Sequence, residues 1–215
     1  MNSPPERLTV ELLSDTTFGR GEGTAGAVDV EVDHDACGLP FVHGKVLHGL
    51  LRDAWLSMRR HFPELADSAR GLLGTEGDLA ESAVLRLGAG LLPEDVRLWV
   101  RYAVGRAEEP LRPEQILHTL TAVRRQTAQS RLTGAALEPT LRCSRVVLRG
   151  LTFEAPLTWL SPPEPGHLQC LALCALAVRH AGLGRNRGRG FVRLTLDGDE
   201  AGTRRAAGLA GGKQR

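Results

Sequence analysis

The stretch from His167 to Leu196 limits the possible fold more than any other part of the sequence. Residues His167 to Ala181 (HLQCLALCALAVRHA) are apolar almost all round, which predicts a helix buried in the protein core. A loop rich in glycine and arginine follows, and Phe191 to Leu196 (FVRLTL) then has the composition of a strand. We expect Gly182 or Gly184 to cap the helix. The loop is therefore predicted to be held at both ends by the core.

Four further elements precede this unit. Leu8 to Leu13 (LTVELL) alternates apolar and polar residues and predicts a strand. Val46 to Phe62 places apolar residues at helical spacing, which predicts an amphipathic helix that Pro63 ends. Val146 to Leu148 and Leu151 to Leu160 are candidate strands. The order of elements predicts an α+β fold with a ferredoxin-like (RRM-like) split β-α-β core, an architecture common among proteins that bind single-stranded RNA.

The middle of the chain has a weaker pattern because several glycines interrupt it. Val96 to Val104 resembles a strand, and Pro113 is expected to open a short helix that reaches Val123. Residues 124–145 are polar and rich in arginine, with Thr133-Gly134 at their centre. This composition predicts a protruding loop or hairpin.

Length and composition fit one globular domain. The chain has 215 residues, of which 42% are hydrophobic and 24% are charged. We expect a single domain at 1–197, with a large insertion at about 64–120 and a thumb hairpin at about 121–145, and a disordered tail at 198–215. The longest apolar run is far shorter than the roughly 20 residues that span a bilayer. No secretory signal is recognisable either, so we expect a cytoplasmic protein without a membrane partner.

The net charge of +2 hides an uneven distribution. Residues 1–40 contain eight acidic residues and two arginines, whereas residues 120–150 contain six arginines and one acid. Residues 179–193 add five arginines and no acid. Because guanidinium groups bind phosphate with two hydrogen bonds and stack on bases, these clusters favour a nucleic-acid partner.

Two glycine motifs are candidates for binding phosphate. The first, P-x-x-x-G-x-x-x-x-G-x-x-R, runs from Pro40 to Arg52, and its Gly44 precedes the amphipathic helix. Free N–H groups in the first helical turn and the helix dipole favour a phosphate there, and Lys45 adds positive charge. The second, G-x-G-x-x-x-G-x-G-F, runs from Gly182 to Phe191 and predicts a cationic loop with accessible backbone amides.

Together the two motifs resemble those of the RAMP superfamily of CRISPR-associated proteins, in their order, spacing and structural context. Within that superfamily the sequence is most similar to the repeated backbone subunit of type III (Csm and Cmr) effector complexes. Gly26-Ala27-Val28-Asp29 resembles the acidic loop of those subunits, and Thr133-Gly134-Ala135 lies in a region that resembles their thumb. His43, Lys45, His48 and Arg145 depart from the usual pattern of the family, which bears on the type of subunit.

The resemblance implies a guide-RNA-binding subunit that cleaves complementary target single-stranded RNA, present in several copies in a filament with other effector subunits. Asp29 would hold Mg²⁺ or Mn²⁺, or orient the nucleophile, with Asp33 or Asp35 as alternatives. The thumb would splay one base out of the guide–target duplex. RNA contacts are implied for residues of the helix, the thumb and the glycine-rich loop: Gly44, Lys45, His48, Arg52, Arg131, Thr133, Arg185, Arg187 and Arg189.

Two other functions fit the same sequence. His34, His43 and His48 lie close together in the chain, and RAMP endonucleases that process guide RNA use histidine without a metal. A capping RAMP subunit that binds RNA without chemistry is the second alternative.

Overall fold

A computed structural model of the chain describes residues 3–19, 23, 28–74, 84–128, 132–135, 140–185 and 188–209. Its centre is a four-stranded antiparallel sheet with the strand order β2-β5-β1-β6. The strands of this sheet are β1 (Arg7–Leu12), β2 (Leu85–Leu87), β5 (Thr152–Trp159) and β6 (Val192–Leu196).

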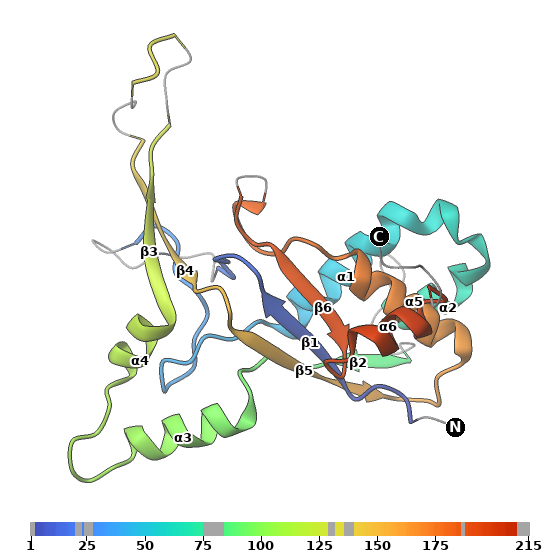
Figure 1. Ribbon diagram of the computed structural model, residues 1–215, viewed down its shortest axis with the longest axis horizontal. Coiled ribbons are helices and arrows are strands. Elements are labelled where there is room, and N and C mark those ends of the chain that lie inside the picture. The colour runs from blue at the N-terminus through green and yellow to red at the C-terminus, as the bar shows by residue number, and fades with distance from the viewer. Residues whose placement is uncertain are drawn as a thin grey trace.

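Alternating residues explain why the sheet has one buried face. In β1, Leu8, Val10 and Leu12 are fully buried, while Thr9 and Glu11 point to the opposite face. The buried face packs against α1 (Gly44–Met58), α2 (Ala66–Leu73) and α5 (Pro165–Ala177). Figure 1 shows these helices together on one side of the sheet. Helix α5 is buried along most of its length, as its apolar sequence predicts.

The connections reproduce the predicted split β-α-β arrangement. Helix α1 lies between β1 and β2 in the chain, and α5 lies between β5 and β6. Strand β5 separates β1 from β2 in the sheet, and β1 separates β5 from β6. This order is consistent with a ferredoxin-like core in an α+β fold with antiparallel sheets.

A second unit lies between β2 and β5 in the chain. It consists of α3 (Glu94–Val104), α4 (Pro113–Leu120), β3 (Thr121–Gln126) and β4 (Arg142–Val147). Strands β3 and β4 pair as a separate antiparallel ribbon, with Thr121 opposite Val147 and Gln126 opposite Arg142. Figure 1 shows this β3–β4 ribbon standing away from the main sheet, with α3 and α4 beside its base.

The prediction of a strand at Val96 to Val104 is wrong, because these residues belong to α3. Every second residue from Val96 is apolar, which imitates a strand. The ends nevertheless favour a helix. Pro93 precedes it, Glu94 and Asp95 lie in the first turn, and Arg101 lies in the last turn, so the charges match the helix dipole.

Two predictions for the C-terminal region are also corrected. Helix α5 ends at Ala177 rather than at a glycine cap, because Arg179 and Ala181 already form backbone hydrogen bonds to Val192 and Gly190. Part of the tail expected to be disordered forms α6 (Glu200–Ala206).

The physical reason for α6 is a helix cap that the low-complexity composition obscures. The Asp199 side chain accepts a hydrogen bond from the Gly202 N–H at 2.9 Å. The buried Thr203 hydroxyl also accepts the Leu196 N–H at 2.9 Å and so ties α6 to β6. No helix in the described part of the chain is long and apolar enough to cross a membrane.

Candidate functional site

A groove of about 440 Å³ lies where the end of the β3–β4 ribbon at Gln126 and Arg142 meets the second glycine motif. Gly182 to Arg185 and Arg189 of this motif line one side, and Arg142 to Ser144 of β4 line another. Asp29, Thr17 and Gln126 complete the groove. The fold therefore brings together two of the segments that sequence motifs singled out, although more than 150 residues separate them in the chain.

Asp29 is exposed and its backbone is held against β4. Its N–H donates to the Cys143 carbonyl at 2.8 Å. The Cys143 N–H donates in turn to Asp29 Oδ2 at 2.6 Å. Val30 continues this pairing by accepting the Arg145 N–H at 2.9 Å. One carboxylate oxygen of Asp29 is thus fixed by the ribbon, and the residue lines the groove.

The neighbouring acids have different environments from Asp29. Asp35 Oδ1 accepts backbone N–H groups of Cys37 and Leu39, each at 2.9 Å. Asp33 Oδ2 lies 3.6 Å from His43 Nε2. Neither aspartate lines the groove, so the geometry favours Asp29 over both alternatives.

Glu31, two residues after Asp29, is buried. Its Oε1 accepts a hydrogen bond from Arg145 Nε at 2.6 Å, and both side chains are nearly inaccessible to solvent. Arg145 Nη1 also reaches Thr121 Oγ1 at 3.3 Å. This pair joins the Asp29 segment to the ribbon.

The second glycine motif forms a compact loop. The glycines at 182, 184, 188 and 190 all have positive φ angles, between 72° and 77°. A Cβ atom at Gly190 would also collide with the Ala181 carbonyl, so glycine is required there. Arg189 Nη1 donates to Ser144 Oγ at 3.3 Å, which places its guanidinium on the ribbon side of the groove. Arg185 Nη1 lies 3.6 Å from Asp53 Oδ2 of α1.

The first glycine motif forms the start of α1, as predicted, but Gly44 has a structural role. A Cβ atom there would collide with the Leu87 carbonyl at the end of β2. Backbone packing therefore explains why glycine is needed at this position, and a bound ligand is not required to explain it. Lys45 is exposed beside it, and Arg52 is half-buried two turns later on the same helix.

The three histidines have separate partners. His34 Nδ1 lies 3.0 Å from the Asp35 carbonyl, and His43 packs edge-on against Phe41 and pairs with Asp33. His48 is half-buried, and its pKa is lowered mainly by burial and further by the charge of Arg52. These contacts do not form a shared histidine centre, so they do not favour the metal-free processing function.

The remaining predicted RNA-binding residues belong to the ribbon tip and the glycine-rich loop. Thr133 lies in an exposed turn, where its Oγ1 accepts the Ala135 N–H at 3.3 Å. Arg131 and Arg187 lie outside the described residues.

Sequence reasoning missed three residues that line the groove, Gln126, Arg142 and Ser144. Arg142 belongs to an arginine cluster that was recognised as a whole. Its position in the groove depends on the register of β3 and β4, in which Gln126 lies opposite Arg142. No local motif marks either residue.

The open face of the main sheet differs from that of RRM domains. RRM domains stack bases on aromatic rings of this face. Here the outward positions of β1 and β5 hold Thr9, Glu11 and Glu154. The described outward positions of the sheet contain no aromatic residue. A binding site for RNA is therefore expected at the ribbon and the glycine-rich loop rather than on the open face of the sheet.

The described residues do not form a resident metal site. No group of three or more His, Cys, Asp or Glu side chains in this part of the chain could hold an ion. Asp29 is the single carboxylate among the residues that line the groove. A protein-built Mg²⁺ or Mn²⁺ site commonly needs more oxygen ligands than this. The predicted metal therefore stays a prediction.

The fold and the groove define a ferredoxin-like α+β protein with arginines around one exposed carboxylate. The sequence matches no protein-family model and no curated protein. Solved structures do share the fold. One is a chain of the type III-B Cmr-beta complex bound to cognate target RNA, with a TM-score of 0.66 and 12% identity over 89% of this chain and 96% of that chain. A chain of the same complex in the apo state gives 0.65 and 13% over 91% and 98%.

Proposed function

We propose that this protein is a guide-RNA-binding backbone subunit of a type III CRISPR effector complex and a member of the RAMP superfamily. Three independent observations support the proposal. The two glycine motifs have the order and spacing of that superfamily. The fold is similar to a chain of the Cmr-beta complex. The proposal rests chiefly on the groove, which brings together Asp29, the β3–β4 ribbon and the glycine-rich loop. Each of these three parts has a separate task in handling RNA.

The guide RNA is seated by the glycine-rich loop and α1. Arg185 and Arg189 contribute guanidinium groups, and the loop backbone provides N–H groups that suit phosphate oxygens. Lys45 and Arg52 extend the positive surface along α1. The seat contacts the RNA backbone and not the bases, so it accepts guides of any sequence.

The target RNA pairs with the guide beside the β3–β4 ribbon, which acts as the thumb. The ribbon tip near Thr133 inserts between base pairs and turns one target nucleotide out of the duplex. Extrusion frees the adjacent phosphodiester from helical geometry, so that its 2′-hydroxyl can align with the P–O5′ bond.

Asp29 acts on this aligned nucleotide. Its carboxylate accepts the proton of the 2′-hydroxyl as the 2′ oxygen attacks phosphorus. The P–O5′ bond then breaks, and water protonates the departing 5′ oxygen. The products are a 2′,3′-cyclic phosphate and a 5′-hydroxyl. Arg142 and Arg189 line the same groove and would stabilise the negative charge that grows on the phosphoryl oxygens.

The decisive experiment uses the complex assembled with guide RNA and a complementary target. Asp29→Ala is expected to lower the cleavage rate by about 100-fold or more, the usual contribution of a general base, without releasing either RNA. Asp95→Ala is the matched control, because Asp95 is an exposed aspartate of α3 that bonds only to its own helix.

Each result separates the alternatives. Unchanged cleavage by Asp29→Ala would refute the catalytic role, and native mass spectrometry would then distinguish a single capping copy from several backbone copies. Loss of cleavage in EDTA would support the predicted metal. Failure of the wild-type complex to retain guide RNA would overturn the proposed function as a whole.

A further inference from the structure

A second groove, of about 690 Å³, lies between the end of α1 and helix α2. The short helical turns 59–61 and 63–65 connect these helices. The groove is separate from the one at Asp29 and shares no lining residue with it. It is lined by arginines from both helices and the connecting turn, namely Arg52, Arg59, Arg60 and Arg70.

Among the residues that the structure describes, the charge of this groove is largely uncompensated. No acidic residue of this part of the chain lines it. In the described part of the chain, no carboxylate oxygen lies within 4.0 Å of Arg52, Arg59 or Arg60. Arg70 pairs with Asp67 at 3.0 Å, but both side chains are exposed and solvent weakens the pair. Four like charges around one hollow attract an anionic ligand.

The lining of the groove also contains buried apolar side chains. Trp55, Ala69 and Leu73 are buried core residues that also line it. Leu56 lies at the rim and is exposed. An apolar lining among guanidinium groups suits a ligand that combines phosphates with flat bases.

The groove continues the surface on which the guide RNA is proposed to lie. Lys45 and Arg52 are seven residues apart and so share one face of α1, and Arg59 follows seven residues later, just past the end of this helix. Asp53, the residue after Arg52, lies 3.6 Å from Arg185 of the glycine-rich loop. The glycine-rich loop therefore contacts α1 at the residue next to Arg52, which also lines the second groove.

We propose that the groove between α1 and α2 is a second binding site for the backbone of single-stranded RNA. It holds the part of the guide that extends beyond the glycine-rich loop. This inference rests on the proposed function, since it needs an RNA that already occupies the first seat. The predicted ligand contacts are phosphates at Arg59 and Arg60, with Arg52 between the two seats.

The test measures the affinity of the full chain for fluorescent single-stranded RNAs of increasing length, at several salt concentrations. The variant R59Q/R60Q removes two exposed guanidinium groups. The variant R193Q/R204Q is its matched control, because it removes the same charge where two carboxylates, Glu11 and Glu200, lie beside the two arginines. Thermal unfolding of both variants confirms that they fold.

For long RNAs, R59Q/R60Q is expected to bind about tenfold more weakly at low salt. Its log–log salt slope should be smaller by about 1.4, which is two phosphate contacts at roughly 0.7 each. RNAs too short to extend beyond the first seat should bind R59Q/R60Q and wild type with the same affinity. R185Q/R189Q should weaken binding at every length.

The outcomes distinguish this inference from the proposed function. No RNA binding by wild type would overturn the proposed function. Equal affinities and slopes for R59Q/R60Q and R193Q/R204Q would overturn the second site alone. Retained RNA affinity together with loss of an acidic partner subunit from the complex would also overturn it and assign the groove to a protein.

Discussion

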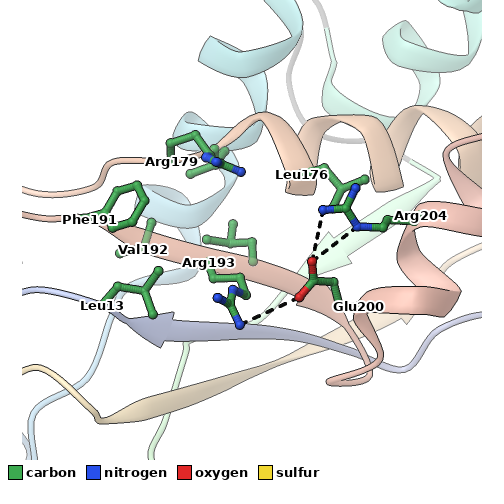
Figure 2. Close-up of a pocket in the computed structure, with 10 residues that line it drawn as sticks. Leu13, Leu176, Arg179, Phe191, Val192, Arg193, Glu200 and Arg204 are labelled. Atoms are coloured by element: carbon green, nitrogen blue, oxygen red, sulfur yellow. Dashed lines mark hydrogen bonds and ion pairs between the residues drawn. The ribbon is translucent and has the colours of Figure 1, made fainter. Parts of the chain in front are cut away.

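The arginines of two surface hollows differ in what surrounds them. Those between α1 and α2 line a groove in which no described residue is acidic. Those at the outer side of β6 line a smaller cavity of about 230 Å³ (Figure 2). There, Arg193 Nη1 lies 3.5 Å from Glu11 and 3.7 Å from Glu200, and Arg204 lies 3.1 Å from Glu200. Figure 2 shows both guanidinium groups directed at Glu200.

The comparison shows that a cluster of arginines in the sequence is not a cluster of free charge in space. Residues 179–193 contain five arginines and no acid. Arg193 is nevertheless paired with Glu11, which lies on the neighbouring strand β1. Arg179 packs over the ring of Phe191, with 6.0 Å to its centre. The distribution of carboxylates, set by the fold, decides which arginines are available to phosphate.

The largest effect, on the free energy of unfolding, is expected at the buried ion pair between Glu31 and Arg145. Glu31→Ala leaves the buried Arg145 guanidinium without its carboxylate. The free energy of unfolding in urea should fall by about 3–5 kcal/mol, as for other broken buried pairs. The double variant Glu31→Leu with Arg145→Met should recover most of this loss. A loss below about 1 kcal/mol in the single variant would contradict the structural role of the pair.

A smaller effect, on RNA affinity, is expected at the β6 cavity. It tests whether nearby carboxylates decide which arginines bind phosphate. Glu200→Gln removes the carboxylate shared by Arg193 and Arg204. The released cations should raise the affinity for single-stranded RNA at low salt by about twofold to fivefold. Glu114→Gln, an equal charge change on the exposed side of α4, is the control. Equal affinities for the two variants would show that carboxylates do not govern which arginines bind RNA.

The smallest effect concerns pH. Burial and Arg52 lower the pKa of His48, so the unfolded chain takes up a proton more readily than the folded protein. Stability is then complete above the unfolded pKa of about 6.5 and falls as pH drops through the lowered folded pKa.

Arg52→Gln removes one cause of this shift and should reduce the acid loss of stability by less than about 1 kcal/mol, because His48 is only half-buried. Urea unfolding between about pH 5 and 7 measures it. Arg59→Gln serves as control. An identical pH profile for Arg52→Gln and wild type would contradict the influence of an uncompensated Arg52 charge.

Strong local patterns predicted the core elements well. Alternation identified β1, helical spacing identified α1, and an almost fully apolar run identified α5. Prediction failed where local signals competed. In α3 the exposed Leu98 and Tyr102 complete an alternating pattern with the buried Val100, which conceals the helix. In α6 a single aspartate cap outweighs a composition typical of disorder.

The candidate site likewise has features that local sequence predicts and features that only the folded structure reveals. The sequence by itself determined the glycine-rich loop and the start of α1, because each depends on residue types within a few positions. Only the tertiary structure decided that Asp29 contacts Cys143 and that Glu31 pairs with Arg145, each 114 residues away. It also decided which arginines remain without a carboxylate. Charge pairing and strand register depend on distances in space, which residues far apart in the chain acquire only when it folds.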